Sequence, residues 1–158
     1  MLRVDIRELQ RGSMRTKGQL GADDPAFEGL DLDVVGNVLV DGQLQATSEG
    51  EYLWRGSIHA VVRGECRRCL AEVLEEVDLD VNAAVFSSDP EAADDPDFYP
   101  LPPRPTSVDV TPVVREELAL TVPSHLLLCR DDCAGLCPRC GADLNAGPCA
   151  CRTSAEPV

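Results

Sequence analysis

Aromatic residues are scarce in this 158-residue sequence, at 4% of the chain. A hydrophobic core must therefore be built mainly from Val, Leu and Ala. Whole domains keep only about 5–15 kcal/mol of net stability, so we expect such a core to be marginally stable and a bound metal to contribute to the free energy of unfolding. The length suits one ordinary domain with a small appendage.

Long hydrophobic runs are also missing. No segment approaches the roughly 20 apolar residues that a membrane-spanning helix needs. The opening MLRVDIRELQRG interleaves charged with apolar side chains, unlike the continuous apolar stretch of a secretory signal. We therefore expect a cytoplasmic protein without a membrane partner, in a reducing compartment where structural disulfides are rare.

Basic residues are few, since 14 Lys and Arg stand against 28 Asp and Glu and give a net charge of −14. Nucleic-acid binders usually neutralise phosphates with Lys and Arg, so this surface would on average repel RNA. A local exception is possible if a helix begins at Asp5, because Arg3, Arg7 and Arg11 would then share one face. A solvated helix face is the favoured interpretation of these arginines, ahead of an RNA contact.

Recognisable catalytic motifs are absent from the sequence. It has no Gly-rich phosphate loop, no Gly-x-Ser-x-Gly nucleophile turn and no His-Glu-x-x-His zinc motif. The two histidines, His59 and His125, lie far apart in the chain. We therefore predict a protein that is not an enzyme and has no small-molecule substrate.

Residues 29–86 alternate apolar with polar side chains, which predicts an antiparallel sheet. Asp41-Gly42 lies between apolar runs and predicts a tight hairpin turn. Gly56 interrupts the next β-rich run and indicates a bulge or a close backbone contact. A further long strand is expected over residues 73–85.

Residues 87–108 hold six prolines and five acidic residues. This composition cannot bury a core, so it predicts an extended, mobile loop. Phe98 and Tyr99 are the only large aromatic residues within it, and we expect them to anchor the loop on the sheet.

A helix is expected directly after this segment. Thr111-Pro112 combines an N-cap candidate with proline at the first helical position. The helix should run to about Thr121 and bury Val114 and Leu118 on its inner stripe.

Eight cysteines are the strongest chemical signal in the sequence. Two cysteines separated by two residues can occupy adjacent corners of a tetrahedral zinc site. In Cys137-Pro-Arg-Cys140-Gly141 the glycine also permits the positive φ that such a turn requires. An all-cysteine ligand set predicts closed, structural Zn²⁺ rather than a catalytic metal with an open position.

Eight thiolates suit two zinc sites, although a single filled site stays open. The preferred arrangement gives one metal to the four cysteines nearest the C-terminus: Cys137, Cys140, Cys149 and Cys151. A pair between two strands then shares the other metal with two cysteines that follow the helix: Cys66, Cys69, Cys129 and Cys133. The competing arrangement places the four cysteines from Cys129 to Cys140 on one metal.

Arginines flank several of the cysteines, among them Arg67 and Arg68. Balancing the thiolate charge is the favoured role for them, ahead of recognition of a phosphate. A redox Cys-x-x-Cys typically lies at a helix N-terminus, which lowers the pKa of one thiol. Because Cys66 and Cys69 fall in a predicted antiparallel hairpin, a thiol redox enzyme is the least favoured alternative.

The predicted fold class is therefore α+β: an antiparallel β-sheet with one main C-terminal helix and a cysteine-rich zinc-binding tail. We expect a sheet-and-helix body at residues 1–128 and a zinc-knuckle tail at residues 129–158, with the acidic loop of residues 87–108 inside the body.

The ordered set of motifs resembles the YceD family, whose members are called large ribosomal RNA subunit accumulation protein. The resemblance rests on GECRRCL at Gly64–Leu70, LALTVP at Leu118–Pro123 and GLCPRCGADLN at Gly135–Asn145, together with the DIRELQRG opening. It covers most of the chain and is much more specific than any one cysteine pair.

The resemblance implies a non-enzymatic role in ribosome biogenesis, in the accumulation or processing of large-subunit rRNA. An acidic protein suits a basic ribosomal protein or an assembling particle as its partner. The alternative is a zinc protein that binds the rRNA directly through Arg3, Arg7, Arg11, Arg67 and Arg68.

Overall fold

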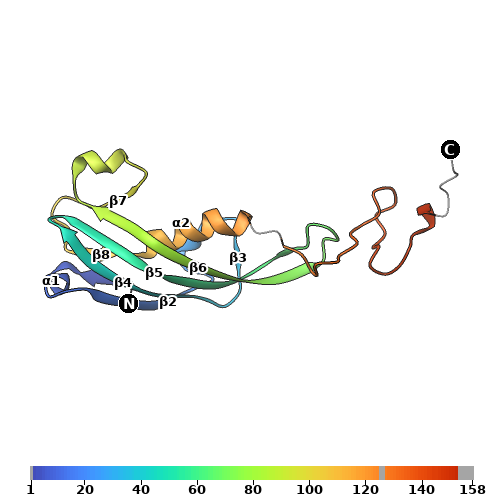
Figure 1. Ribbon diagram of the computed structural model, residues 1–158, viewed down its shortest axis with the longest axis horizontal. Coiled ribbons are helices and arrows are strands. Elements are labelled where there is room, and N and C mark those ends of the chain that lie inside the picture. Colours follow the sequence, from blue (N-terminus) through green and yellow to red (C-terminus); the bar gives the residue numbers. More distant parts are fainter. Residues whose placement is uncertain (1, 125–126, 153–158) are drawn as a thin grey trace.

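The computed structural model describes residues 2–124 and 127–152. The molecule is elongated, with a sheet-and-helix body at one end and a cysteine-rich tail at the other (Figure 1). The body contains these elements: β1 (Arg3–Asp5), α1 (Ile6–Leu9), β2 (Met14–Gly21), β3 (Asp33–Val34), β4 (Asn37–Ser48), β5 (Glu51–Glu65), β6 (Glu72–Ser87), β7 (Phe98–Pro100), β8 (Ser107–Asp109) and α2 (Thr111–Thr121). Short 3₁₀ turns cover Pro25–Phe27, Pro90–Asp94, Val122–Ser124 and Ala150–Arg152.

The main sheet has the strand order β2-β4-β5-β6-β7, and β3 pairs with β5 beside β4. All of its pairs are antiparallel except β6 with β7, which makes the sheet mixed. β1 and β8 form a separate antiparallel pair. The mostly antiparallel sheet and the single main helix near the C-terminus confirm those parts of the predicted fold class.

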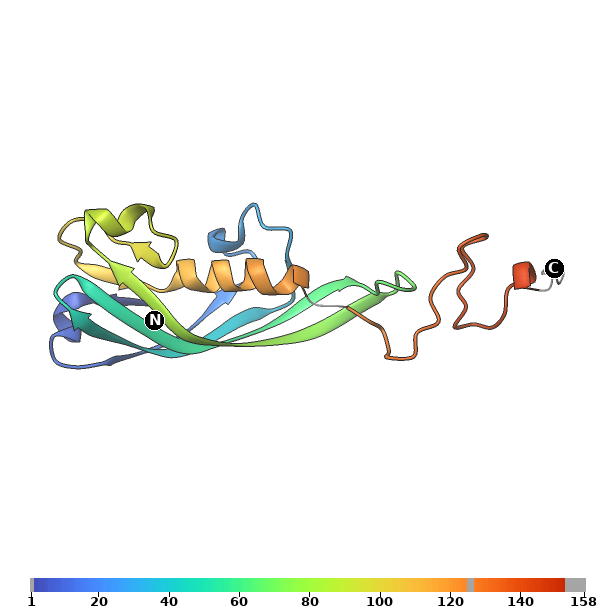
Figure 2. The ribbon, with the colours of Figure 1, turned by 45° about the horizontal axis from the view of Figure 1, so that its top comes forward.

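The helix α2 lies along one face of the main sheet (Figure 2). It ends at Thr121 as predicted, but Thr111 is its first helical residue and not its N-cap, which is Val110 without a side-chain hydrogen bond. The helix buries Val113 beside the expected Val114 and Leu118. Its first turn is held by Asp109, whose carboxylate accepts a hydrogen bond of 2.9 Å from the backbone N–H of Thr111. The core beneath the helix is built mainly from Val, Leu and Ala around one tryptophan, Trp54.

The predicted hairpin turn at Asp41-Gly42 is wrong, because both residues lie inside β4. Gly42 faces Gly56 of β5 in the strand register. A Cβ atom added to Gly42 would lie 2.7 Å from the Trp54 ring, and one added to Gly56 would lie 2.6 Å from it. The two glycines therefore make room for the indole ring and do not form a turn. The turn between β4 and β5 instead falls at Gly50, which has φ +78°.

Gly56 has the role that the sequence predicts for it. The register between β5 and β6 shifts between Trp54 and Gly56, which marks a bulge. The indole N–H of the fully buried Trp54 donates a hydrogen bond of 2.7 Å to the Thr16 hydroxyl on β2.

Residues 87–108 are more structured than the predicted extended loop. They contain a 3₁₀ turn, the whole of β7 and most of β8, so the prediction of irregular structure is a partial error. Proline does not exclude short edge strands, and β7 is one. The anchoring role is confirmed for Tyr99, since the Tyr99 and Phe86 ring centroids lie 5.2 Å apart.

The N-terminal helix begins as predicted, with the Asp5 side chain accepting a hydrogen bond of 2.8 Å from the Arg7 backbone N–H. It ends after one turn, at Leu9. The predicted helical face of three arginines is therefore wrong: Arg3 lies on β1, and Arg11 follows the helix. Leu9 is buried in the core, and the chain then turns through Gly12, with φ +137°, before β2 begins.

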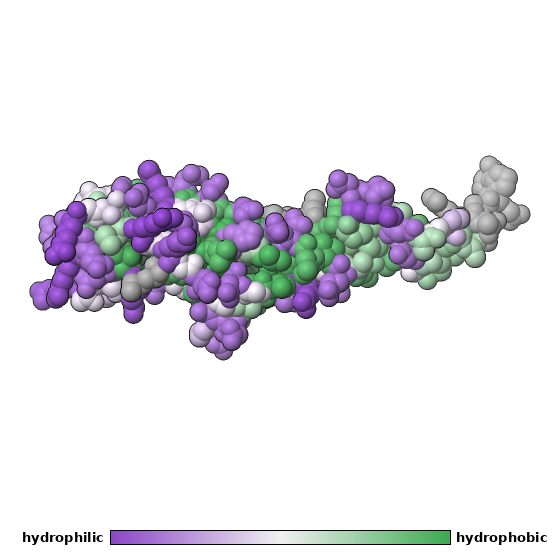
Figure 3. Space-filling view, turned by 90° about the horizontal axis from the view of Figure 1, so that it is seen from below, coloured by the Kyte–Doolittle hydropathy of each residue, from purple (hydrophilic) through white to green (hydrophobic). Residues whose placement is uncertain are grey.

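Large apolar side chains reach the surface at four positions in the described chain: Leu39, Leu70, Leu74 and Leu120. In the view of Figure 3, hydrophobic residues surface along the middle of the molecule and continue toward the cysteine-rich end. Hydrophilic residues dominate the opposite end.

Candidate metal centres

The eight cysteine side chains gather into two groups of four, and within each group all sulfur atoms lie within 4.8 Å of one another. The first centre is formed by Cys66, Cys69, Cys129 and Cys133, and the second centre by Cys137, Cys140, Cys149 and Cys151. This is the grouping that the preferred arrangement predicts. Metal ligation itself stays a prediction.

The sulfur distances fit tetrahedral zinc rather than disulfides. The sulfurs of Cys66 and Cys133 are 3.8 Å apart, and those of Cys69 and Cys129 are 3.5 Å apart. A disulfide requires about 2.05 Å, whereas Zn–S bonds of about 2.3 Å at tetrahedral angles separate two sulfurs by about 3.8 Å. All eight cysteines are free thiols.

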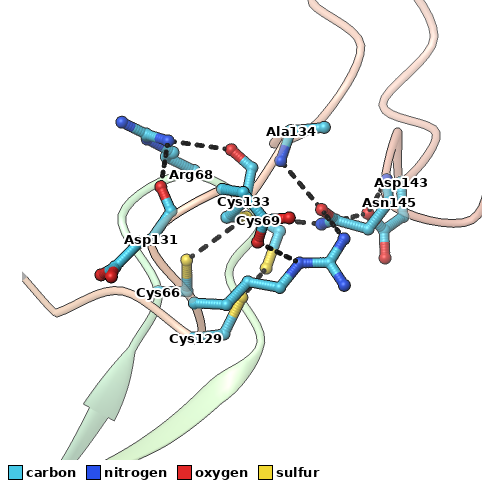
Figure 4. Close-up of polar contacts among 11 residues, drawn as sticks. Cys66, Arg68, Cys69, Cys129, Asp131, Cys133, Ala134, Asp143 and Asn145 are labelled. Carbon is cyan, nitrogen blue, oxygen red and sulfur yellow. Dashed lines mark hydrogen bonds and ion pairs between the residues drawn. The ribbon is translucent and has the colours of Figure 1, made fainter.

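The first centre joins two parts of the chain that are distant in sequence. The connection between β5 and β6 supplies Cys66 and Cys69, as predicted, and the segment after α2 supplies the other two sulfurs. Arg67 reinforces this junction, because its backbone N–H donates 3.0 Å to the Leu127 carbonyl. Figure 4 shows the labelled side chains of this centre converging between the hairpin and the tail.

Each centre is built on a Cys-x-x-Cys knuckle with the same backbone hydrogen bonds. In the first knuckle, the N–H of Cys66 donates to the Ala71 carbonyl and the N–H of Leu70 donates to the Cys66 carbonyl, both at 2.8 Å. In the second knuckle, the N–H of Cys137 donates to the Ala142 carbonyl and the N–H of Gly141 donates to the Cys137 carbonyl, both at 2.8 Å. The chain therefore carries two copies of one metal-binding turn.

The residue after each knuckle has a left-handed backbone, as the glycine in the second knuckle predicts. Gly141 has φ +72° and Leu70 has φ +61°. Leucine is rare in this conformation. The sequence signal that would have revealed it is that Leu70 follows the first knuckle at the position that Gly141 holds after the second.

Backbone N–H groups directed at sulfur favour the thiolate form in both knuckles. The pKa of Cys66 falls to about 6, mainly through the backbone N–H of Cys129. The pKa of Cys137 also falls to about 6, mainly through the backbone N–H of Cys140. These N–H groups therefore favour the thiolate form of one cysteine in each centre, and the thiolate is the form that binds a metal.

Crowding by other sulfurs has the opposite effect on a second thiol of each centre. The pKa of Cys129 rises to about 12, with Cys69 as the largest cause. The pKa of Cys151 likewise rises to about 12, mainly because of Cys140. A dication placed among four such sulfurs would remove this mutual repulsion, so the donor set fits Zn²⁺.

The arginines beside the first centre bind backbone carbonyls. Arg68 Nη1 donates 3.0 Å to the Cys133 carbonyl and 3.3 Å to the Asp131 carbonyl. Arg67 Nη2 donates 3.4 Å to the Pro123 carbonyl. Arg68 therefore helps to hold the tail against the hairpin, and Arg67 helps to hold the end of the helical segment there.

The arginines predicted as a possible RNA contact are not brought together. Arg3 lies on β1, 3.8 Å from the Asp109 carboxylate, and Arg7 and Arg11 are exposed around α1. This N-terminal group lies at the α1 end of the body, whereas Arg67 and Arg68 belong to the β5–β6 connection, at the end of that hairpin away from α1 (Figure 1). Of the histidines, His59 is a β5 residue 2.7 Å from Asp78, and His125 lies outside the described residues.

The most important residue that sequence reasoning missed is Asn145. Its side-chain Nδ2 donates a hydrogen bond of 3.4 Å to the sulfur of Cys133. This bond lowers the pKa of the Cys133 thiol more than any other interaction. An asparagine in a cysteine-rich loop carries no distinctive sequence signal.

The fold and the two centres define a small sheet protein with two four-cysteine clusters that could each hold a metal ion. A family model described as "Large ribosomal RNA subunit accumulation protein YceD" matches residues 54–157. The chain therefore belongs to the YceD family. This family is associated with the accumulation of large-subunit ribosomal RNA and is not a known enzyme family.

Similar curated proteins include ones from Mycobacterium tuberculosis and Mycobacterium bovis, each described as uncharacterized. They are 32% identical to this chain over 129 residues, which cover 78% of this chain and 61% of the relative. The chain thus spans about three fifths of the length of these relatives. No solved structure matches the chain. Within the described residues, α2 and the shorter helices all fall short of the length and apolar character of a membrane span.

Proposed function

We propose that this protein is a non-enzymatic, cytoplasmic ribosome-biogenesis factor that supports the accumulation or processing of large-subunit rRNA. It does so by docking on a ribosomal protein or an assembling particle. Membership of the YceD family carries the proposal. The charge of the chain supports the choice of a protein partner over bare RNA.

The strand β6 offers a surface that suits a basic partner. It carries five acidic residues and no Lys or Arg: Glu72, Glu75, Glu76, Asp78 and Asp80. Within the described chain, β7 covers its outer edge only from Val85 to Ser87, and no strand pairs with that edge before Val85. Complementary charge would speed the encounter with a basic ribosomal protein and orient it.

We further propose that both centres hold structural Zn²⁺ through all eight cysteines. A bound Zn²⁺ would supply a closed tetrahedral crosslink with no open position for a substrate. The hairpin cysteines, Cys66 and Cys69, would then fasten the tail to the body. Elemental analysis of protein purified without chelator should find two zinc ions per chain.

The docking proposal is tested by affinity capture of the tagged protein from a cell lysate, with and without ribonuclease. We expect large-subunit ribosomal proteins to be recovered in both conditions. The double variant Glu76→Lys/Asp80→Lys should lose them, because it reverses two exposed charges on β6. The matched control is Glu8→Lys/Asp23→Lys, which makes the same change in net charge at exposed positions outside β6.

Loss of every ribosomal component on ribonuclease treatment would contradict protein docking. It would favour the direct rRNA-binding alternative and move Arg67 and Arg68 from a structural to a functional role. Equal recovery by the β6 variant and its control would show that the partner binds elsewhere on the molecule.

A further inference from the structure

The loop between the two halves of the second centre reaches back to the first centre. In sequence, Asn145 lies between Cys140 and Cys149, which both belong to the second centre. In space, its side chain contacts the first centre at Cys133, with Nδ2 3.4 Å from the sulfur. Figure 4 shows Asn145 and Asp143 beside this sulfur cluster.

The same side chain also fastens the segment that carries Cys133. Its Oδ1 accepts 2.8 Å from the backbone N–H of Ala134 and 2.7 Å from Arg130 Nη2. Donor and acceptor ends of one amide are therefore both engaged at the first centre. This use of both ends fixes the direction of the amide, because a rotated side chain would place its oxygen against the sulfur.

The position of Asn145 is set by its own loop. Asp143 Oδ1 accepts from the Asn145 backbone N–H at 2.9 Å and from its Nδ2 at 2.8 Å. The neighbouring Leu144 donates its N–H to the Gly135 carbonyl at 2.9 Å. The amide is thus oriented by its own loop, whose two ends are Cys140 and Cys149 of the second centre.

We propose that Asn145 is a positioning residue that orients Cys133 in the first centre. Through this contact, metal binding at the first centre depends on whether the second centre is closed. When the second centre is closed, Cys140 and Cys149 fix both ends of the loop and Asn145 is held at Cys133. When the second centre opens, the loop ends are released and the N–H···S contact is lost. The inference rests on the proposed metal occupancy of both centres.

The chemistry of the contact explains why it matters for binding a metal. Four thiolates around one dication leave a formal charge of −2, and a donated N–H stabilises that charge. Removal of outer-shell partners of this kind typically weakens metal binding by about 10–100-fold. Coupling between two sites is reciprocal, so filling the first centre should also favour closure of the second.

The test uses the full chain loaded with ¹¹³Cd²⁺, which reports each centre by its own NMR resonance. Asn145→Asp keeps an acceptor for Ala134 and Arg130 but removes the N–H that reaches Cys133. We expect it to shift the first-centre resonance only and to speed metal loss from that centre to a competing chelator by about 10–100-fold. Asn82→Asp, the same chemical change at an exposed position on β6, is the matched control and should alter neither resonance.

Coupling is tested by opening the second centre with Cys149→Ser/Cys151→Ser. Alone, this change should speed metal loss from the first centre almost as much as Asn145→Ala does. Combined with Asn145→Ala, it should add little, because both changes remove the same contact.

Three outcomes would overturn the inference. Two cadmium resonances that Asn145→Asp leaves unchanged would refute the role of Asn145 while leaving metal occupancy intact. Additive effects of Asn145→Ala and the double serine variant would refute the coupling. Absence of any bound cadmium would overturn both the inference and the proposed metal sites, but not the proposed docking function.

Discussion

Leu70 occupies in the first knuckle the backbone position that Gly141 occupies in the second. Both have positive φ, at +61° and +72°. Glycine adopts this conformation freely, whereas a residue with a Cβ atom loses about 1–2 kcal/mol there. Leu70 is also 59% exposed, so packing recovers little of that cost.

Leu70→Gly should therefore stabilise the protein by about 0.5–1 kcal/mol, since the relief of strain exceeds the greater backbone freedom of glycine in the unfolded chain. The reciprocal change Gly141→Leu should destabilise the second knuckle by about 0.5–1 kcal/mol, since the same two opposing effects act with reversed sign. Denaturant unfolding measures the first change, and metal release from the second centre measures the other. A loss of stability in Leu70→Gly would show that the leucine side chain supports the hairpin.

Thr16 and Trp54 are both fully buried and are joined by a side-chain hydrogen bond, whose contribution to stability can be tested by mutation. Thr16→Val keeps the shape of the side chain but leaves the indole N–H without its acceptor, which should cost about 1–3 kcal/mol. Thr16→Ser keeps the hydroxyl and is the control. Urea unfolding followed by the fluorescence of the single tryptophan measures both, and equal midpoints would contradict the role of the bond.

At the scale of elements, the strands and α2 could be predicted because their signals are local. Alternating apolar residues mark β5 and β6, and Thr111-Pro112 marks the start of α2. The error at Asp41-Gly42 arose because a glycine that makes room for a distant ring looks the same in sequence as a turn glycine. The ring that explains it, Trp54, lies on the neighbouring strand and is placed there only by the strand register.

The grouping of the cysteines into two centres could also be predicted, because its sequence signals are local as well. The spacing within each knuckle is local, and the hairpin position of Cys66 and Cys69 follows from the two flanking strands. The contact of Asn145 with Cys133 depends on how the tail loops fold back, and no local pattern encodes that. Sequence therefore predicts the sulfur ligands but not the residue that orients them.

The tail is a separate element only in its second half, because Cys129 and Cys133 are tied to the body through the first centre. We predict that Cys140→Ser opens the segment from Cys137 to Cys151 and leaves the main sheet folded. Structural zinc contributes about 10–16 kcal/mol in small zinc peptides, far more than so short a segment gains otherwise.

Hydrogen exchange followed by mass spectrometry checks this prediction. Peptides from residues 137–151 should lose protection, while those of β5 and α2 keep it. Ala142→Ser is the matched control, since it adds a hydroxyl to the same exposed stretch without removing a thiol. Unchanged protection of residues 137–151 in Cys140→Ser would contradict a separate zinc-dependent tail.

At the scale of the whole molecule, the hydrophobic core and the cysteine centres are separate structures. The cluster that surrounds Trp54 contains no cysteine. The two centres follow one another beyond the end of the β5–β6 hairpin, away from that core (Figure 2). The acidic body and the cysteine-rich tail can therefore make different contacts in one elongated molecule.

This separation predicts how the protein responds when metal is stripped with a strong chelator under reducing conditions. The body should keep its sheet, because its core does not depend on the cysteines, so the emission of Trp54 should stay that of a buried indole. The tail and the hairpin end should open, which frees the backbone for trypsin at four arginines whose side chains are already exposed: Arg67, Arg68, Arg130 and Arg139. Arg55 and Arg63, inside the paired part of β5, should stay protected. Simultaneous cutting at both sets of sites, together with a red shift of the emission, would show instead that metal and core form one cooperative unit.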